Sequence, residues 1–180
     1  MVKLFTGVGD QGKTCVIDGC VQKDDPRIEA VGSVDELNSS IGFALSFQTS
    51  GITQQVLERV QDHLFIIGAE IASAGQENAR VPKLEKKHVD EIEKDIHALE
   101  KQLDKQKFFV LPRGTQAASA LHLSRAIARR AERDVLRVKE NAHVNPDLLV
   151  YLNRVSSLLY GLALLENKMS GFKEKPPSYK

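Results

Sequence analysis

The amino-acid sequence predicts an all-α protein, a five-helix bundle preceded by a glycine-rich N-terminal loop. Apolar residues recur with a helical period almost continuously from residue 27 onward. Asp25-Pro26 and Asn145-Pro146 each combine a capping side chain with a proline that suits the first helical turn. Because the helices are long and their connections short, we expect them to pack antiparallel in one bundle.

The first two helices are defined by their apolar stripes and by small polar residues at their ends. The first helix should begin at Asp25-Pro26 and end before Ser50-Gly51; its stripe consists of Ile28, Val31, Val34, Leu37, Ile41 and Leu45. The second should end near Ala74-Gly75; its stripe consists of Val56, Leu57, Val60, Leu64, Ile67 and Ile71. A polar loop, Gln76 to Pro82, follows.

Three further helices complete the predicted bundle. The third has an apolar 3-4-3-4 spacing formed by Val89, Ile92, Ile96, Leu99 and Leu103. A short apolar connector, Phe108 to Leu111, is interrupted by Pro112-Arg113-Gly114. Thr115 caps a fourth helix that runs to about Lys139. The fifth runs from Pro146 to about Lys168, and its inward face consists of Leu149, Leu152, Val155, Leu159 and Leu162.

Length and composition indicate one folded domain. The chain has 180 residues, of which 42% are hydrophobic and 27% charged, values that exclude disorder as the main state. A net charge of +1 excludes a protein that binds nucleic acid through its bulk charge. We divide the domain into a loop segment (1–26, with at most a short strand at Val2 to Phe5), the helix bundle (27–170) and a frayed polar tail (171–180).

The cysteines and the apolar runs indicate a cytoplasmic protein. Cys15 and Cys20 have no zinc-site spacing and are too few for a disulfide framework, so we expect two reduced thiols. The N-terminus lacks the apolar region of a signal peptide. The longest aliphatic runs, such as Leu64 to Ala69, are far shorter than the roughly 20 residues that span a membrane.

Residues 7–14, GVGDQGKT, fit the phosphate-binding pattern G-x-x-x-x-G-K-[ST] at every position. A true P-loop lies between a buried strand and a helix of a parallel sheet, and this sequence predicts neither the helix nor further strands. Closely spaced glycines still expose backbone amides, and Lys13 and Lys23 add positive charge. The sequence therefore leaves two interpretations, a phosphate-binding loop on another scaffold and a flexible N-terminus.

Arginines are concentrated on the fourth helix. Arg125, Arg129 and Glu132 share one stripe, and a neighbouring row consists of Arg130, Arg133 and Arg137. The pattern suits bidentate contact with phosphate or carboxylate, although a solvated face with ion pairs would have the same composition. Asp35 and Asn153 lie close to the apolar stripes of their helices, which suggests polar groups that meet across helices or subunits.

Other catalytic patterns are weak. A di-iron helix bundle needs two E-x-x-H motifs, and only Glu85 to His88 fits one, so we predict no resident metal site. No spacing indicates a nucleophile paired with a general base.

Three blocks of sequence resemble the PduO-type ATP:cob(I)alamin adenosyltransferases, and their order and spacing cover most of the chain. The first consists of residues 5–14, 23–27 and 34–39, the second of 109–112, 121–125 and 129–133, and the third of 151–156 (YLNRVS). The resemblance implies a five-helix bundle with ferritin-like up-down packing that assembles as a homotrimer with active sites between subunits.

The implied reaction transfers the 5′-deoxyadenosyl group of ATP to cob(I)alamin, giving adenosylcobalamin and triphosphate. Cobalt is the nucleophile, which agrees with the missing nucleophile–base pair. The resemblance implies ATP, Mg²⁺ and the corrinoid as ligands. The implied partners are further copies of the chain, a flavoprotein reductase and an adenosylcobalamin-dependent enzyme, with no nucleic acid and no membrane.

The resemblance also implies roles for individual residues. The triphosphate would be lined by Thr6, Gly7, Val8, Gly9, Thr14, Cys15 and Lys23 on one side and by Arg129, Arg130, Ala131, Glu132 and Arg133 on the other. Asn153 would hold the nucleotide or its magnesium, and Arg125 would act near the leaving phosphates. Asp35 would pair with Arg129 of a neighbouring subunit, and Phe109 would lie beneath the corrin and exclude the lower cobalt ligand.

Four positions depart from the family's usual residues, namely Gly7, Val8, Arg113 and Ser157. Ser157 stands where an aspartate is usual, so we place no metal ligand there. Two other functions remain open at this point, a nucleotide-binding bundle with a regulatory or scaffold role and a purely structural bundle. ATP binding separates the structural bundle from the others, and adenosylcobalamin formation separates the enzyme from the regulator.

Overall fold

Five helices and one small sheet make up the computed structural model, which describes residues 5, 7–16, 19–76 and 80–179. The order is a 3-10 turn Val8–Gln11 (η1), β1 Lys13–Val16, β2 Gly19–Gln22, α1 Pro26–Leu45, α2 Gly51–Ala72, α3 Lys86–Gln102, α4 Gln116–Val138 and α5 Pro146–Met169. The all-α class and all five predicted helices are confirmed.

Three of the helices begin at the capping residues that the sequence predicts. The Asp25 side chain accepts a hydrogen bond from the Arg27 backbone N–H at 2.9 Å, directly before α1. Thr115 accepts from the Ala118 N–H at 3.0 Å before α4, and Asn145 accepts from the Asp147 N–H at 3.0 Å before α5. Each cap satisfies an amide that the first helical turn leaves without a partner.

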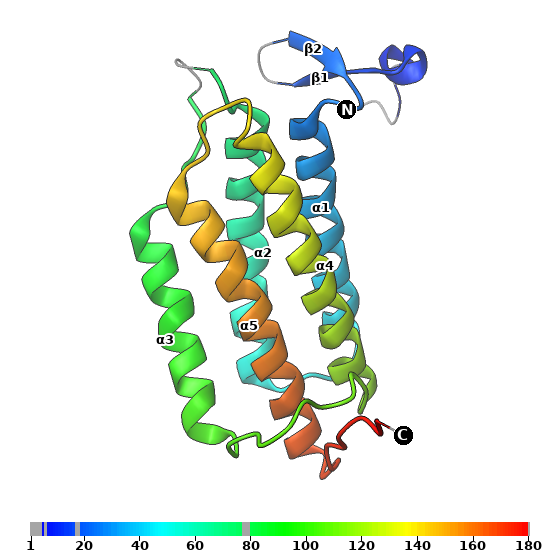
Figure 1. Cartoon of the computed structure of the whole chain (residues 1–180), viewed down its shortest axis with the longest axis vertical. Coiled ribbons are helices and arrows are strands. Elements are labelled where there is room, and N and C mark those ends of the chain that lie inside the picture. Colours follow the sequence, from blue (N-terminus) through cyan, green and yellow to red (C-terminus); the bar gives the residue numbers. More distant parts are fainter. Residues whose placement is uncertain (1–4, 6, 17–18, 77–79, 180) are drawn as a thin grey trace.

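The bundle is built around α4 and α5. Helix α1 packs against α2 and α4, α4 against α5, and α5 against α3 (Figure 1). The interior is aliphatic, as expected from a sequence without tryptophan, and its most buried large side chains include Leu37, Ile41, Leu64, Ile67, Leu121, Leu152 and Leu159. Three residues of the predicted α1 stripe, Ile28, Val31 and Leu45, are only half-buried because they lie toward the ends of the helix.

Helix α5 is long and apolar enough to cross a membrane by length and composition alone. Two thirds of its most apolar stretch is buried inside the bundle. Its apolar side chains therefore face the other helices, as in the core helix of a globular protein.

The N-terminal segment corrects the sequence prediction of a loop with at most a strand at Val2 to Phe5. Residues 2–4 lie outside the described residues, and β1 and β2 instead form an antiparallel hairpin in which Lys13 pairs with Gln22. The hairpin lies beyond the N-terminal end of α1, above the bundle in Figure 1. Four-residue strands without a buried residue are too short to give a clear alternating pattern.

The prediction of two reduced thiols is wrong. Cys15 and Cys20 form a disulfide, because the hairpin register places them directly opposite each other. The number of cysteines gave no reason to expect a disulfide, but their short spacing is the one that a tight hairpin needs.

The connector before α4 and the C-terminal tail are joined through Asn167, which is fully buried. The Asn167 amide donates to the Arg113 carbonyl at 2.9 Å and to Glu174 at 2.8 Å, and its oxygen accepts from the Thr115 N–H at 3.0 Å. A Cβ on Gly114 would lie 1.8 Å from that oxygen, so only glycine fits. The segment predicted to be frayed thus has defined contacts near its start.

Candidate functional site

The arginines of α4 divide into two groups by their partners. Arg130 pairs with Glu36 of α1, and Arg137 pairs with Asp134 at 2.9 Å and with Glu29 at 3.5 Å. This row is the solvated, ion-paired face that the sequence left open as an alternative. By contrast, Arg125, Arg129 and Arg133 make no ion pair with any residue that the structure describes. Their charges are available to an anionic ligand.

A cavity of about 770 Å³ lies between α3, the connector, α4 and α5. Arg125, Arg129 and Phe109, three residues predicted for the site, all line it. The other walls combine apolar and hydroxyl side chains, among them Leu99, Leu103, Leu164, Ser156 and Tyr160. A mostly apolar hollow of this size with a few convergent polar groups is typical of a small-molecule site.

Phe109 is 83% exposed at this cavity, which is unusual for a large apolar side chain. Exposed rings commonly mark a surface that a ligand or partner covers. The structure therefore places Phe109 where an apolar ligand in the cavity would contact it.

The buried His122 and the half-buried Arg125 both have unused hydrogen-bonding capacity. Neither the Arg125 Nε nor either ring nitrogen of His122 has a partner among the described residues. His122 is 3% exposed, and burial together with the charge of Arg125 lowers its pKa to about 4. The ring is thus neutral at physiological pH. His122 lies in the sequence block 121–125 but was not predicted for the site, because the residues next to a histidine in the chain do not reveal whether it is buried.

A hydrogen-bonded relay crosses three helices next to the arginine stripe. Asn153 of α5 donates to Glu132 of α4 at 3.0 Å and accepts from Arg154 at 3.0 Å. Arg154 in turn donates through Nε to Glu93 of α3 at 3.0 Å. Two predicted residues, Asn153 and Glu132, therefore meet directly. Arg154 and Glu93 were not predicted for the site, and Glu93 carries no sequence signal because it lies on a generally charged helix.

The N-terminal loop has the backbone of a phosphate cradle but not the P-loop fold. Gly7 and Gly12 have φ values of +74° and +77° at the two ends of η1, and a strand rather than a helix follows them. Lys23 closes the loop, because its N–H donates to the Gly12 carbonyl at 2.8 Å. The Lys23 ammonium lies over Gly9, where an added Cβ would be 3.1 Å from it. Thr6 and the side chain of Val8 lie outside the described residues.

The loop and the arginine stripe are not brought together within one chain. No hydrogen bond or ion pair joins the described residues of the segment 5–23 to α4. The loop lies beyond the start of α1 (Figure 1). Arg125 and Phe109 instead line the cavity between α3, α4 and α5. Asp35 is exposed on α1 and pairs with no described residue. The predicted site is therefore incomplete in a single copy.

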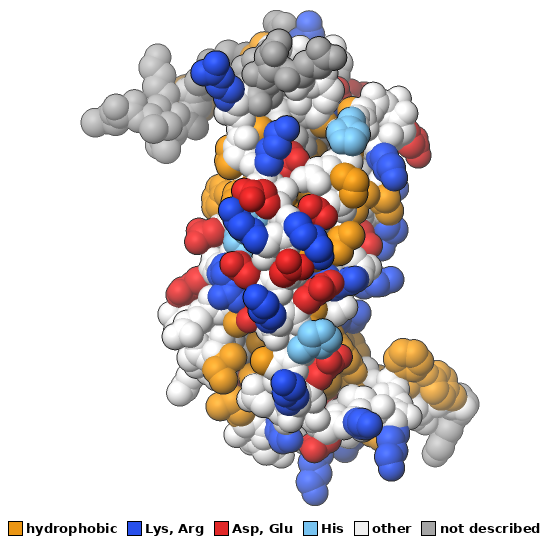
Figure 2. All heavy atoms as spheres, turned by 90° about the vertical axis from the view of Figure 1, so that its left-hand side faces the viewer, with side chains coloured by type: hydrophobic (Ala, Val, Ile, Leu, Met, Phe, Trp, Pro, Cys, Tyr) orange, Lys and Arg blue, Asp and Glu red, His pale blue; other side chains and the backbone are white. Residues whose placement is uncertain are grey.

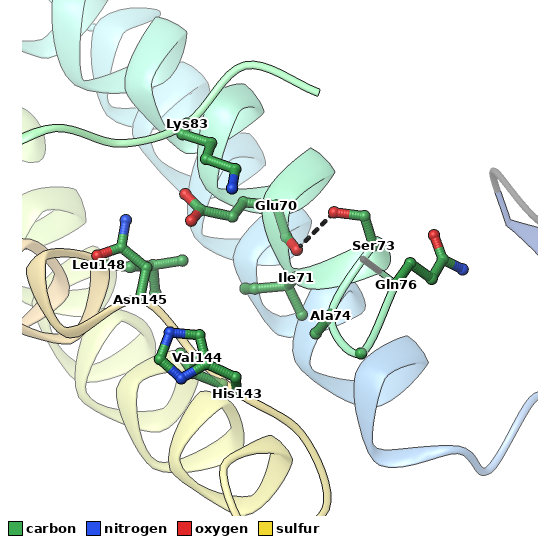
Figure 3. Close-up of a pocket in the computed structure, with 11 residues that line it drawn as sticks. Glu70, Ile71, Ser73, Ala74, Gln76, Lys83, His143, Val144, Asn145 and Leu148 are labelled. Carbon is green, nitrogen blue, oxygen red and sulfur yellow. Dashed lines mark hydrogen bonds between the residues drawn. The ribbon is translucent and has the colours of Figure 1, made fainter. Parts of the chain in front are cut away.

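A second cavity, of about 510 Å³, contains none of the predicted site residues (Figure 3). Two of its polar side chains, Glu70 and Asn145, have structural tasks. Glu70 accepts from the Leu84 N–H at 2.9 Å, and Asn145, the cap of α5, donates to the Leu84 carbonyl at 2.8 Å. These bonds fix the segment that enters α3, so we assign the chemistry to the other cavity.

Comparisons with known proteins point to one family. Residues 4–166 match the family model described as cobalamin adenosyltransferase. The chain is 36% identical over 176 residues to a corrinoid adenosyltransferase of Bacillus subtilis, covering 94% of this chain and 89% of that protein. It is 35% identical over 180 residues to the human corrinoid adenosyltransferase MMAB, covering 96% and 72%.

Solved structures give the same result. One is a variant of the PduO-type ATP:corrinoid adenosyltransferase from Lactobacillus reuteri, complexed with cobalamin and ATP. It matches this fold with a TM-score of 0.91 at 32% sequence identity, over 98% of this chain and 97% of that one.

Proposed function

Because the chain belongs to the cobalamin adenosyltransferase family, we propose that the corrinoid occupies the cavity beside Phe109 and that ATP lies against the arginine stripe. The chain is an ATP:corrinoid adenosyltransferase, an enzyme that adenosylates cobalamin at the expense of ATP. What remains to be assigned is how its own residues perform that reaction.

Charge is the main requirement of the proposed chemistry. The cobalt of cob(I)alamin attacks C5′ of the ribose, the C5′–O bond breaks, and triphosphate leaves with the bonding electron pair. The protein supplies no nucleophile, so its contribution is to orient C5′ toward cobalt and to stabilise the negative charge of the leaving group. Arg125 and Arg129 line the cavity without a carboxylate partner, which suits them for this task.

We assign most of the remaining predicted residues to ATP. Arg130 and Arg133 continue the wall of the triphosphate site on α4: Arg130 would exchange its partner Glu36 for phosphate, and Arg133 is steadied by a 2.9 Å hydrogen bond to the Arg129 carbonyl. The side chain of Ala131 is fully buried in the bundle core, so the predicted contact of Ala131 with triphosphate is not proposed. The opposite wall is formed by Lys23 and by the loop from Thr6 to Gly9, followed by Thr14 and Cys15. Gly7 and Val8 contribute backbone groups only, since they lack the basic and hydroxyl side chains usual in the family.

We propose that Mg²⁺ binds at the hydrogen-bonded relay where Glu132 of α4 meets Asn153 of α5. Glu132 offers a carboxylate, which Mg²⁺ prefers together with substrate phosphates, and the Asn153 NH₂ group donates to that carboxylate at 3.0 Å. We propose that Mg²⁺ arrives with ATP and neutralises part of its charge, while Arg154 and Glu93 keep the Asn153 amide in a fixed orientation. No step requires a metal site built from protein alone.

Phe109 is proposed to lie beneath the corrin and to exclude the lower ligand of cobalt. Its exposed ring at the cavity supports this role. A cobalt without a lower ligand is easier to reduce to the nucleophilic state.

We propose a homotrimer with active sites between subunits. An apolar groove on the face of α1 and α4 supports it: Phe43 and Leu123 are 54% and 55% exposed there, beside Phe47. The face formed by α3, in contrast, alternates acidic and basic side chains (Figure 2), with ion pairs such as Lys86–Asp90 at 2.9 Å. A second copy on the apolar face would bring an N-terminal loop to the stripe and Asp35 to Arg129.

We further propose a cytoplasmic protein that works with a flavoprotein reductase and an adenosylcobalamin-dependent enzyme. The support is chemical: cobalt must be reduced before it attacks C5′, and the product is a cofactor that a further enzyme uses.

The cavity shared by Phe109, Arg125 and Arg129 is the observation that carries the proposed site. The test supplies ATP, magnesium and chemically reduced cobalamin under anaerobic conditions and follows the adenosylcobalamin absorption spectrum. We expect conversion that depends on ATP. ATP binding without any conversion would instead identify the chain as the nucleotide-binding regulator considered above.

A further inference from the structure

The proposed function gives no role to the disulfide between Cys15 and Cys20. Both residues are exposed, and they face each other across an antiparallel strand pair. Exchange between a disulfide and a thiolate requires access to one of the sulfur atoms. Exposure therefore makes this bond open to reduction in the folded protein.

Little else holds the hairpin together. No residue of β1 or β2 is buried, and each strand has only four residues. No hydrogen bond or ion pair connects the described part of the segment 5–22 to any of the five helices. Because an isolated two-stranded hairpin is at best marginally stable in water, the disulfide is the main constraint on its register.

That register determines the shape of the candidate nucleotide loop. The loop ends where β1 begins, at Lys13, and Lys23 follows the last residue of β2. The strand pairing brings the Lys23 N–H to the Gly12 carbonyl at 2.8 Å and its ammonium to Gly9. If the strands separate, Lys23 loses its position over the loop.

We propose that Cys15 and Cys20 form a reversible thiol–disulfide modification site, and that the oxidised form binds ATP more tightly than the reduced form. The inference depends on the proposed role of the loop in ATP binding. An oxidised hairpin presents Lys23 and the loop amides already in place, whereas the reduced hairpin must be ordered when ATP binds. In a reducing compartment, disulfides are usually transient and redox-sensing, which fits such a switch.

The reductant is a dithiol. One of its thiolates attacks a cysteine sulfur, breaks the S–S bond and forms a mixed disulfide while the other cysteine leaves as a thiol. The second thiol of the reductant then displaces the first cysteine. The reductant is oxidised to its own disulfide, and the two cysteines take up the corresponding two electrons and two protons. Exchange with an oxidised dithiol reverses the change.

The experiment measures the Kd of ATP by calorimetry on the full chain without corrinoid, before and after treatment with dithiothreitol. A thiol titration on each sample checks that the bond is closed or open. We expect a Kd about tenfold higher after reduction, a factor within the constraint that a short disulfide loop imposes. After dithiothreitol is removed, oxidation with glutathione disulfide should restore the lower value.

The Cys20→Ser variant, which cannot close the disulfide and leaves Cys15 of the proposed triphosphate wall unchanged, is the matched control. It should bind ATP as the reduced wild type does and should not respond to dithiothreitol. Equal ATP affinities of the oxidised and the reduced wild type would overturn the inference. Two titratable thiols in the protein after oxidation would also overturn it, because the disulfide would then not have formed. An oxidised protein that binds no ATP would overturn the proposed role of the loop instead.

Discussion

At the scale of single residues, Arg125 is the side chain on which the proposed chemistry depends most. It is half-buried at the cavity, its Nε has no described partner, and no carboxylate neutralises its charge. Donors held in place before the reaction stabilise developing charge more strongly than mobile ones.

Replacing Arg125→Ala should lower kcat for adenosylcobalamin formation by about 10²-fold or more, the effect of removing one such donor. Anaerobic turnover with reduced cobalamin measures it, and size-exclusion chromatography checks that assembly is unchanged. Lys139→Ala, an exposed cation beyond the end of the same helix, is the control and should retain activity. Full activity of the Arg125 variant would reject the assignment.

His122 predicts a pH dependence of stability. Its folded pKa of about 4 lies below the ordinary value of 6.5, because burial and Arg125 disfavour the charged ring. The unfolded chain therefore binds more protons between these values. The contribution of neutral His122 to the free energy of unfolding is complete above pH 6.5. As the pH falls toward 4, the free energy of unfolding decreases by up to about 3 kcal/mol.

The variant His122→Leu should make this loss smaller, as measured by urea unfolding at pH 7, 5.5 and 4.5. Some loss should persist, because burial also lowers the pKa of His63. The exposed His143→Leu change serves as the control and should keep the wild-type dependence. If the free energy of unfolding of the His122→Leu variant fell with pH as steeply as that of the wild type, the proton taken up on unfolding would not belong to His122.

At the scale of elements, the relay from Glu93 through Arg154 and Asn153 to Glu132 connects α3, α5 and α4. The amide nitrogen of Asn153 donates to Glu132, and the amide oxygen accepts from Arg154, so the orientation of the amide is fixed. Arg154 is therefore a positioning residue for Asn153 rather than a group that touches substrate.

Substituting Arg154→Ala should raise the KM for ATP about tenfold, the cost of one charge-assisted hydrogen bond, while Arg154→Lys should recover only part of the loss. Steady-state kinetics with ATP as the varied substrate separates KM from kcat. Arg59→Ala removes the other pair that ties α3 to a neighbouring helix, with Asp95, and should leave the KM unchanged. If Arg154→Ala and Arg59→Ala changed the KM for ATP equally, Arg154 would only stabilise the bundle.

The elements themselves could be predicted from the sequence because helix signals are local. Asp25, Thr115 and Asn145 mark starts that depend on the next few residues, and the apolar stripes depend only on period. The hairpin and its disulfide were missed because their strands bury nothing. The open hydrogen-bonding capacity of His122 and the position of Glu93 follow from packing between helices distant in sequence, which no local pattern encodes.

At the scale of the whole molecule, the two long faces of the bundle differ in kind. The α3 face has mixed charges and local ion pairs (Figure 2), whereas the α1 and α4 face carries the apolar groove. Burying such a groove against another copy removes apolar surface from water on both sides.

Placing a charge in the groove, Phe43→Asp, should therefore shift the proposed trimer toward monomers, and activity should fall with it. Light scattering coupled to size-exclusion chromatography measures the mass of the assembly. Phe65→Asp adds the same charge at a phenylalanine that is 72% exposed on α2, outside the groove, and should leave the mass unchanged. A trimer that tolerates both changes would place the interface elsewhere.

The hydrogen bond of 3.0 Å between the Leu111 N–H and the Lys175 carbonyl has a practical consequence for protein engineering. It places the final residues of the chain against the connector that bears Phe109, while the opposite terminus leads directly into the candidate nucleotide loop. An affinity tag or fusion partner attached near either end would thus adjoin one of the two proposed substrate sites. A fusion intended to preserve activity is better inserted at the α4–α5 turn, around residues 139–141, where the chain is exposed and belongs to neither proposed site.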